Sequence, residues 1–422
     1  MNSYIESINT FLYYGYLPDP HVHLPASLKL WFNGHLHGSD YSSLPKSEII
    51  RIGVSILRDC FKEEISNVYN ESHVLPLSGG LDSRTILANL LEYLEPAKII
   101  TVTFGVPGSP DYEMAQLIAK KAGVKWEGID LSPGKWNWNT DLLIDTAKRG
   151  ERPTGLFDNA VNHAIRIKYG DKCIYWSGLM GDPLARINPL SYNVKTWEQA
   201  KTVFAIKNCK SKTYKLSNPD FNPKTCLPKQ SYTDADRLDY YSQLYYCIRQ
   251  LCLIQHIYSP KGYRILHPFL HPKWLTFILS VPVHYRHHQI LYRRIQETSW
   301  PHLFNKQNSP FRDSPIYYDL IHGRKRYFLR KIIKKALPKK FNSFLGADKN
   351  VNYIDWNYAL RYQDDLNYMI YSNLHDLKAR KIIDWLNIDK LWAYHQNTEI
   401  NLAKELMTLA ALEIHLKTKT LA

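Results

Sequence analysis

The sequence predicts an α/β protein with a parallel sheet, followed by a helical C-terminal region. Between residues 73 and 178, short β-branched apolar runs alternate with longer segments whose apolar residues recur at helical spacing. Such alternation is typical of βαβ units, in which a crossover helix joins two parallel strands. After residue 178 the strand pattern fades, and helical periods dominate to the end of the chain.

The predicted elements follow one another from the N-terminus. Residues 1–45 are rich in proline and histidine, show no long period, and are expected to form an extended arm. A helix is expected over residues 49–68, where apolar residues recur at helical intervals. The next predicted elements are a strand at 73–77, a helix at 83–94, a strand at 98–106, a helix at 111–123, a strand at 124–131 and a strand at 172–178.

The composition is that of an ordinary globular protein. The chain has 422 residues, 45% of them hydrophobic and 22% charged, which suffices for two or three domains. Apolar runs stay shorter than the roughly 18 residues that a membrane helix needs, so we expect no membrane span. The N-terminus lacks the pattern of a signal peptide, and the six cysteines show no CxxC spacing. These features predict a reduced, cytoplasmic protein.

The net charge of +15 is unevenly distributed. The segment RKRYFLRKIIKKALPKKFNSFLGADK, residues 324–349, carries ten Lys or Arg residues and one acid, with apolar residues at helical spacing. This pattern predicts an amphipathic basic helix. Its basic face is either an ordinary solvated surface or a surface that binds a polyanion such as nucleic acid.

A loop rich in glycine and serine stands between the first predicted strand and its helix, in HVLPLSGGLDSRTILANLL. Backbone N–H groups at such a junction, with the helix N-terminus behind them, form an anion site. Gly79 and Gly80 let the main chain approach phosphate oxygens, Ser78 and Ser83 add hydroxyl donors, and Asp82 can hold Mg²⁺. The lysine of the GxxxxGK[ST] loop is missing, so this loop suits pyrophosphate as a leaving group.

The segment LSGGLDS resembles the pyrophosphate-binding motif of the N-type ATP pyrophosphatases, and specifically of the asparagine synthetase family. Four further segments resemble motifs of that family in the same order. FGVPGSPDYEMAQLIAKKAG resembles its second strand, acidic loop and helix, and WSGLMGD resembles its SGxGxDE loop. LHPFLHPKWLTFILSVP resembles its RxPFLDxxLVxxALSxP helix, and LAKELMTLAALEIHL resembles its closing helix. The resemblance covers nearly the whole chain.

The resemblance implies a Rossmann-like ATP pyrophosphatase fold, similar to the adenine nucleotide alpha-hydrolases. Residues 1–45 would correspond to the linker after a glutaminase domain, 46–300 to the synthetase domain and 301–422 to a helical region that completes it. The family usually begins with that glutaminase domain, whose N-terminal cysteine is the nucleophile. This sequence starts Met1-Asn2, and its first cysteine is Cys60. We therefore expect nitrogen from free ammonia, from an amine on the substrate, or from a separate glutaminase subunit.

The resemblance also implies a reaction and its residues. A carboxylate attacks the α-phosphorus of ATP in the presence of Mg²⁺, which yields an acyl-adenylate and pyrophosphate, and an amine then displaces AMP to form an amide. Asp82 and Asp182 match the two metal-binding aspartates. The pyrophosphate cradle matches Ser78, Gly79, Gly80 and Ser83, and the positions that line the nucleotide match Leu77, Phe104, Ser177 and Gly178.

Three positions depart from the family pattern. The third position of the SGxGxDE loop carries Glu or Tyr in the family, to help deprotonate the amine, but here it is Leu179, which cannot take a proton. The Glu after the loop aspartate is replaced by Pro183, and the PFLD aspartate by His271.

The lysine that stabilises the transition state in the family lies between two prolines spaced as Pro301 and Pro315 are. An ungapped match on these prolines places that position at Ser309. Lys306 and Arg312 lie three residues to either side, so we expect one of them to be the catalytic cation. Lys349 is the second choice.

These features predict an ATP-dependent, AMP-forming amide synthetase that acts on a small-molecule or peptide carboxylate. The altered loop residues favour a specialised substrate over aspartate, and lactam or macrolactam formation is one alternative. A second alternative is adenylation of a tRNA base, with the basic segment on RNA phosphates. A third is a degenerate nucleotide-binding subunit that regulates a partner.

Overall fold

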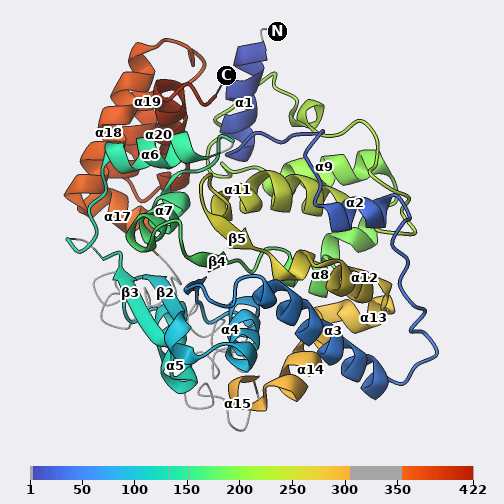
Figure 1. The fold of residues 1–422 in the computed structure, drawn as a ribbon. Coiled ribbons are helices and arrows are strands. Elements are labelled where there is room, and N and C mark those ends of the chain that lie inside the picture. Colours follow the sequence, from blue (N-terminus) through green and yellow to red (C-terminus); the bar gives the residue numbers. More distant parts are fainter. Residues whose placement is uncertain (1–2, 133, 151, 305–353, 422) are drawn as a thin grey trace, which may run out of the picture.

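The computed structural model describes residues 3–132, 134–150, 152–304 and 354–421. Its centre is a five-stranded sheet in the order β3-β2-β1-β4-β5, with every neighbouring pair parallel (Figure 1). The strands are β1 (His73–Pro76), β2 (Ile99–Gly105), β3 (Lys125–Asp130), β4 (Ile174–Trp176) and β5 (Arg264–Leu266). The predicted α/β class with a parallel sheet is therefore confirmed.

The strand order reverses next to β1. The chain builds outwards from β1 through β2 to β3, and then returns to place β4 and β5 on the other side of β1. In open α/β sheets, ligands bind at the carboxyl ends of the strands where the order reverses. That point lies here between β1 and β4, which pair through His73 with Ile174 and Val74 with Tyr175.

Four of the five strands are predicted from the sequence, as short runs with apolar residues between helical segments. Strand β4 is fully buried, whereas β3, at the edge of the sheet, is partly exposed. In β1 the side chains of Val74 and Leu75 are almost completely buried, as expected for a central parallel strand. Strand β5 was not predicted, because three residues are too few to show a period.

Helices cover the sheet and form the rest of the molecule (Figure 1). In the N-terminal part they are α1 (Ser3–Tyr14), α2 (Ala26–Phe32), α3 (Lys46–Ser66), α4 (Leu81–Tyr93), α5 (Pro110–Ala122), α6 (Thr140–Arg149) and α7 (Phe157–Tyr169). The middle part has α8 (Gly181–Ala185), α9 (Trp197–Asn208), α10 (Tyr240–Leu244), the π-helix η4 (Tyr245–Ile254), α11 (Gln255–Tyr258), α12 (Pro272–Ser280), α13 (Val283–Arg286), α14 (Ile290–Ser299) and α15 (Pro301–Phe304). The C-terminal part has α17 (Trp356–Tyr362), α18 (Asp364–Ala379), α19 (Ile388–Asn397) and α20 (Ala403–Lys417).

Helices α3, α12 and α14 pack together below the sheet edge that carries the switch point. Gly53 of α3 permits this approach, because a Cβ atom there would lie 2.4 Å from Cδ1 of Ile295 and 2.8 Å from the ring of Phe277. The close packing fixes α14 against α3 and α4, and α14 contributes side chains to the site described below.

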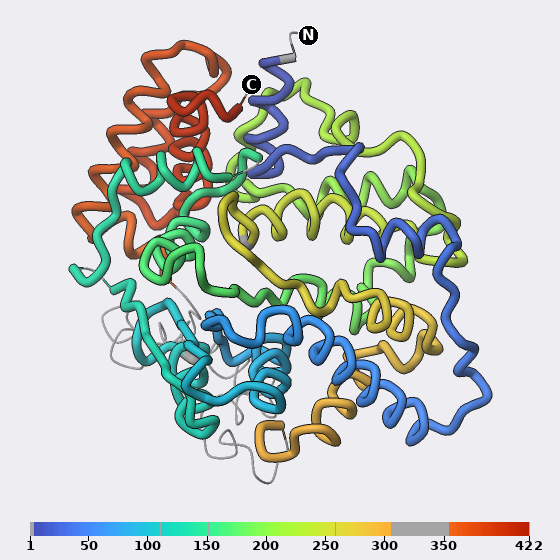
Figure 2. Tube along the Cα trace, in the orientation of Figure 1, coloured from blue at the N-terminus to red at the C-terminus, as the bar shows by residue number. Residues whose placement is uncertain are grey.

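The prediction of an extended arm over residues 1–45 is wrong for residues 3–14, which form the helix α1, and for residues 26–32, which form the helix α2. Ile8, Phe11 and Leu12 are fully buried, and α1 lies beside α20 (Figure 1). These apolar residues recur at helical spacing, a signal that the sequence analysis overlooked in a segment dominated by proline and histidine. From α1 the chain runs along the outside of the molecule to α3, as the blue trace in Figure 2 shows.

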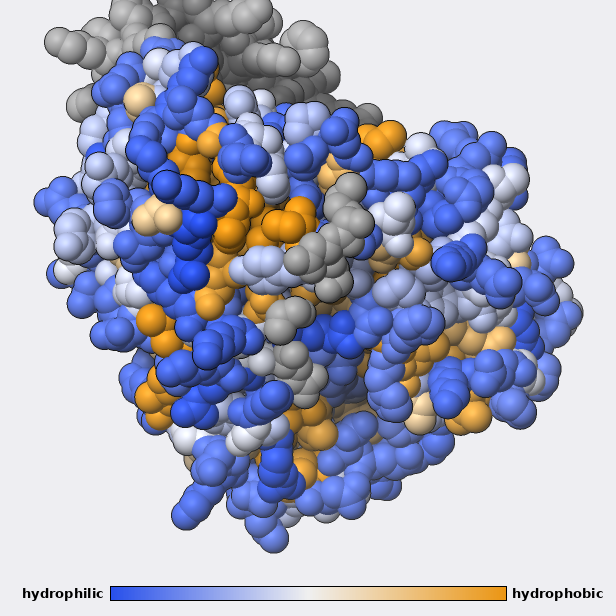
Figure 3. Space-filling model, turned by 90° about the horizontal axis from the view of Figure 1, so that it is seen from above, coloured by the Kyte–Doolittle hydropathy of each residue, from blue (hydrophilic) through white to orange (hydrophobic). Residues whose placement is uncertain are grey.

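A second hydrophobic cluster joins α1, α6 and α7 to the C-terminal helices α17–α20. Within it the buried carboxylate of Glu413 receives two hydrogen bonds from Arg380, at 2.6 and 2.9 Å. This cluster combines residues from all three predicted segments, whose boundaries at 45/46 and 300/301 remain a prediction. Seen from above in Figure 3, the surface is mainly hydrophilic, and apolar side chains gather in recesses between hydrophilic ridges.

Two further expectations concern a membrane span and the basic segment. Among the described residues, no helix is long and apolar enough to cross a membrane. The basic segment 324–349 lies outside the described residues.

Candidate active site

The loop between β1 and α4 carries three consecutive backbone N–H groups at the switch point. Ser78 N donates to Ser83 Oγ at 3.2 Å, and Gly80 N donates to Ser78 Oγ at 3.1 Å. Gly79 N donates to the carboxylate of Asp111. Side-chain oxygens thus hold the loop open at the N-terminus of α4, where the helix dipole favours an anion.

Gly79 is required for the approach of α5 to this loop. A Cβ atom at this position would lie 2.9 Å from Oδ1 of Asp111 and 3.0 Å from Cγ of Met114. Asp111 is the aspartate of the PGSPD segment, and its role is to accept the hydrogen bond from the backbone N–H of Gly79. The helix after β2 is fastened to the loop after β1.

Asp82 and Asp182 come together across the switch point, although 100 positions separate them in the chain. Asp182 N donates to Oδ2 of Asp82 at 3.0 Å, and Tyr292 Oη donates to Oδ1 of Asp82 at 2.9 Å. Gly178 and Gly181 make room for this carboxylate, because a Cβ atom on Gly181 would lie 2.5 Å from Cγ of Asp82, and one on Gly178 3.1 Å from its Cβ.

Burial raises the pKa of Asp82 to about 7; the hydrogen bond from Tyr292 opposes this shift, and the nearby charge of Asp182 adds to it. Burial also raises the pKa of Asp182, while Arg186 and Arg293 oppose the shift. The carboxylate of Asp182 also pairs with Arg186, whose Nε lies 2.9 Å from Oδ2. A cation bound at Asp82 would offset the burial that raises its pKa.

The two aspartates fit Mg²⁺ in the way that nucleotide enzymes hold it. Mg²⁺ usually takes one or two protein carboxylates and completes its shell with substrate phosphates and water. Among the described residues, no group of three or more His, Cys, Asp or Glu side chains could hold a metal ion. Asp82 and Asp182 would therefore share the ion with phosphate oxygens held by the Ser78–Ser83 loop.

Helix α14 supplies side chains that the sequence analysis did not identify. Tyr292 bonds Asp82, and Gln296 Nε2 donates to Thr85 Oγ1 at 2.6 Å on the next turn of α4. Gln289, just before α14, donates from Nε2 to Oδ1 of Asp182 at 2.5 Å. No local pattern marks these residues, because they lie more than 100 positions from the aspartates that they contact.

Arg84 fastens the loop from its other side. Its Nη2 donates to the carbonyl oxygen of Gly79 at 2.7 Å, and its guanidinium lies 5.1 Å from the ring centre of Phe304 in α15. The side chain is buried, which lowers the pKa of Arg84 to about 10. The sequence signal for this role of Arg84 was an arginine on the buried face of a predicted helix, one residue after the LSGGLDS motif.

The remaining predicted residues lie along the same edge of the sheet. Leu77 follows β1, and its carbonyl oxygen accepts from Thr103 Oγ1 at 2.8 Å. Phe104 is near the end of β2, while Ser177 and Gly178 follow β4, where Ser177 Oγ accepts from Leu179 N at 3.2 Å. The predicted cations Lys306 and Arg312, together with Ser309 and Lys349, lie outside the described residues.

The altered motif positions have structural roles. Leu179 is buried in the hydrophobic cluster around α3 and α4, and Met180 adopts a left-handed conformation with φ of 69° at the second glycine position of SGxGxDE. Pro183 lies in α8, and its carbonyl oxygen accepts from Tyr246 Oη at 2.8 Å. His271 caps α12 by accepting from Lys273 N, and its Nε2 lies 3.2 Å from a carboxylate oxygen of Glu63.

The part of the chain that carries the loop and Asp82 is similar to a known protein family. Residues 72–153 match the family model described as Asparagine synthase. This segment is similar to part of the synthetase domain of the asparagine synthase family. The match spans β1 to α6 and includes Asp82 and Asp111, whereas the loop from Ser177 to Asp182 follows it. The match supports an ATP-dependent synthetase, a ligase. A comparison with curated proteins gives no match.

We expect Tyr292→Phe to shift the pH dependence of Mg·ATP binding upwards. With a pKa near 7, Asp82 is protonated at lower pH, and Mg²⁺ must expel that proton, so affinity rises with pH through about 7. Because the Tyr292 hydrogen bond lowers the pKa of Asp82, its loss should move the affinity profile up by about one pH unit. Calorimetric titration of Mg·ATP between about pH 5.5 and 9, in steps of about half a pH unit, measures this shift.

Tyr93→Phe is the matched control, because Tyr93 lies at the end of α4, the helix of Asp82, but donates to the carbonyl oxygen of Arg58, away from the aspartates. Its profile should coincide with that of the wild type. An unshifted profile in Tyr292→Phe would show that Tyr292 does not govern the ionisation of Asp82.

Proposed function

We propose that this protein is an ATP-dependent, AMP-forming amide synthetase that adenylates a carboxylate and transfers the acyl group to ammonia or an amine. The observation that carries the proposal is the pairing of Asp82 with Asp182 beside the Ser78–Ser83 loop, at the carboxyl ends of β1 and β4. A glycine-rich loop at a helix N-terminus suits pyrophosphate, which would take over N–H groups that now donate to side-chain oxygens of Ser78, Ser83 and Asp111. The two carboxylates suit the metal ion that pyrophosphate carries.

The first step is the transfer of the adenylyl group. A carboxylate oxygen of the substrate attacks the α-phosphorus of ATP, a new O–P bond forms, and the bond to the bridging oxygen breaks, so that pyrophosphate leaves. Charge grows on the leaving oxygens, and Mg²⁺ supplies Lewis-acid stabilisation when bound. In this chain, the loop at Ser78 to Ser83 holds the leaving group, and Asp82 and Asp182 orient the metal.

The loop is suited to this step because it is held in place before any substrate binds. Asp111 and Arg84 fasten Gly79 from opposite sides, the first through its N–H and the second through its carbonyl oxygen. Preorganised donors stabilise developing charge without a cost of reorganisation at the moment of reaction. The cation that acts on the α-phosphate is proposed to be Lys306 or Arg312.

The second step is attack of a nitrogen lone pair on the acyl carbon. The C–N bond forms, the C–O bond to the phosphate breaks, AMP leaves, and the nitrogen loses one proton. Leu179 cannot accept that proton, so the proton acceptor differs from that of family members with Glu or Tyr at this position. The nitrogen donor is ammonia, an amine of the substrate itself, which would yield a lactam, or ammonia from a separate glutaminase.

The test is release of pyrophosphate and AMP from Mg·ATP, first with aspartate and ammonium and then with a panel of carboxylates. We expect release that depends on one acid of the panel and yields AMP and pyrophosphate in equal amounts. Mass spectrometry of the product then separates an intermolecular amide from a lactam. Release of ADP and phosphate instead, or the absence of release with every acid, contradicts the proposal.

A further inference from the structure

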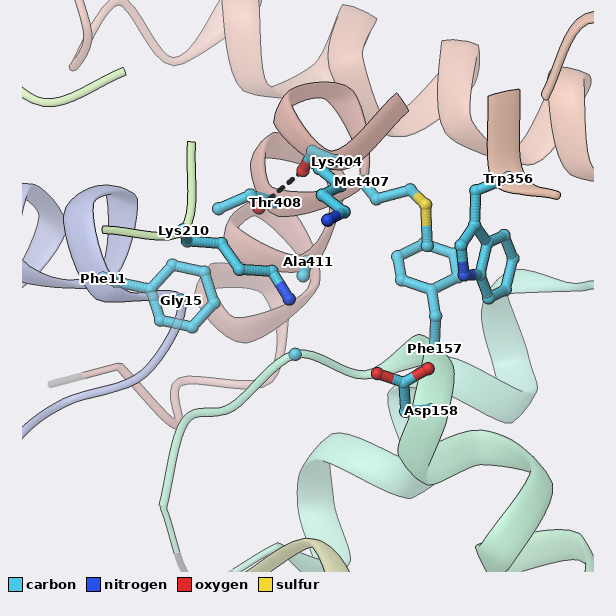
Figure 4. Close-up of a pocket in the computed structure, with 11 residues that line it drawn as sticks. Phe11, Gly15, Phe157, Asp158, Lys210, Trp356, Lys404, Met407, Thr408 and Ala411 are labelled. Carbon is cyan, nitrogen blue, oxygen red and sulfur yellow. Dashed lines mark hydrogen bonds between the residues drawn. The ribbon is translucent and has the colours of Figure 1, made fainter. Parts of the chain in front are cut away.

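Two hollows that share Lys210 and Lys404 lie between α1, α7, α20 and the segment after α9. Their volumes are about 260 and 550 Å³. Together they are large enough for a drug-sized organic ligand. In the smaller hollow the amino groups of both lysines point into the same space, and the carboxylate of Asp158 faces them from α7 (Figure 4).

The hollows are strongly cationic. Five cationic side chains line them: Lys207, Lys210, Lys212, Arg249 and Lys404. In the part of the chain that the structure describes, neither Lys210 nor Lys404 forms an ion pair. Glu405 is buried, and its carboxylate already accepts from the backbone N–H groups of Thr213 and Tyr214, at 3.1 and 3.4 Å. Five cations thus line the two hollows, and Asp158 and Glu405 are the acidic residues among the lining side chains.

The fold holds Lys210 in position. Its backbone N–H donates to the carbonyl oxygen of Tyr13 at 2.7 Å, at the end of α1. Gly15 makes room for its stem, because a Cβ atom on Gly15 would lie 3.1 Å from Cγ of Lys210. Desolvation by the surrounding protein lowers the pKa of Lys210; the nearby carboxylate of Asp158 opposes this shift, and the positive charges of Arg249 and Lys404 add to it. A bound anion would offset the desolvation and the positive charges.

The opposite wall is apolar. Phe157 and Trp356 pack edge to face with ring centres 5.8 Å apart, and Met407 lies beside them, whereas Phe11 lies next to Lys210 (Figure 4). Helix α20 is linked to the segment before α7, because Nε2 of His415 lies 2.8 Å from the carbonyl oxygen of Thr154. A ligand that fills the hollow therefore meets cations on one side and aromatic rings on the other.

The hollow is on the same side of the sheet as the paired aspartates. Helix α7 leads into the parallel strand β4 and runs back along the sheet, so its first residues, Phe157 and Asp158, lie towards the carboxyl ends of the strands. Phe104, near the end of β2, packs against the same hydrophobic cluster as Trp356.

The smaller of the two hollows is named here the Lys210–Lys404 hollow. We propose that it binds the organic substrate by a second acidic group, a carboxylate or phosphate, attached to an apolar or planar body. The inference rests on the proposed function, since the first acidic group is the carboxylate that becomes adenylated. It predicts that the substrate is at least a diacid. The lysines act as specificity residues, because they contact the substrate away from the reacting atoms.

Direct binding tests the site without knowledge of the natural substrate. Phenyl phosphate is titrated calorimetrically into the full chain in the presence of saturating magnesium α,β-methylene-ATP, which occupies the phosphate loop. Benzyl alcohol serves as the uncharged probe. We expect phenyl phosphate to bind, benzyl alcohol to bind at least about tenfold more weakly, and added salt to weaken only the first.

Lys210→Met and Lys404→Met should each weaken phenyl phosphate binding by about tenfold or more, and Lys404→Arg should restore most of the affinity. Lys172→Met is the matched control, because Lys172 is an exposed residue before β4, at the amino ends of the strands. No binding to the wild type, or equal binding to the wild type and both methionine variants, overturns the proposal.

The functional arm separates this inference from the proposed function. With a carboxylate that supports pyrophosphate release, both methionine variants should raise KM about tenfold and leave kcat within about threefold. A loss of kcat without a change in KM overturns the role of the lysines in substrate binding. If no carboxylate supports release but phenyl phosphate binding depends on both lysines, the proposed function fails while the anion site stands.

Discussion

Asp82→Asn and Asp182→Asn should each lower ATP-dependent pyrophosphate release by about 10²–10³-fold. Each substitution removes one carboxylate of the pair that suits Mg²⁺, and each leaves the volume of the side chain almost unchanged. The remaining carboxylate would face the metal and the pyrophosphate alone. The measurement is the initial rate of pyrophosphate release at saturating Mg·ATP, with the acid that the wild type accepts.

The thermal stability of each metal-free variant shows whether a lower rate comes from lost catalysis or from unfolding. Because burial raises the pKa of Asp82 to about 7, its ionised form is unfavourable in the folded protein. The folded protein then binds more protons than the unfolded chain between roughly pH 4 and 7, so this group lowers stability as pH rises through that window. At pH 8 the metal-free Asp82→Asn variant should therefore melt no lower than the wild type.

Asp171→Asn is the matched control for both variants, because Asp171 is exposed in the turn after α7 and should leave the rate unchanged. Full activity in either active-site variant would contradict the assignment of the pair to the metal. A lower melting temperature with residual activity would instead assign the pair a mainly structural role.

Gly181→Ala should strongly damage the site, because the added methyl group would collide with the carboxylate of Asp82. The added Cβ atom would lie 2.5, 2.6 and 2.8 Å from Cγ, Oδ1 and Oδ2 of Asp82, closer than Cβ contacts in proteins allow. The carboxylate is held by Tyr292 and by the N–H of Asp182, so it can yield only by breaking those bonds. A displacement of about 1 Å at a catalytic group costs on the order of 10²-fold in rate.

The same substitution should lower the free energy of unfolding by about 1–3 kcal/mol, as expected for overpacking. Gly150→Ala is the control, because the nearest atom to its new Cβ would be 3.4 Å away, an ordinary contact. Kinetics and denaturant unfolding of the two variants provide the comparison. A Gly181→Ala enzyme that keeps the wild-type rate would show that Asp82 need not occupy its observed position.

The sequence alone determined the centre of the fold and half of the site. The strand β1, the loop with Gly79 and Gly80, and Asp82 lie within ten consecutive residues, so their geometry follows from local backbone preferences. Alternating strand and helix periods likewise predict the parallel sheet, since each βαβ unit closes within a few tens of residues.

Only the tertiary structure decided which distant side chains complete the site. Tyr292 lies 210 positions from Asp82, and it reaches that carboxylate because α14 packs against α3 and α4. The Lys210–Lys404 hollow likewise combines α1, α7 and α20, although α1 had been expected to be extended. Burial of apolar surface chooses such neighbours, and that force is non-directional, so a local pattern shows which face of a helix is buried but not which element covers it.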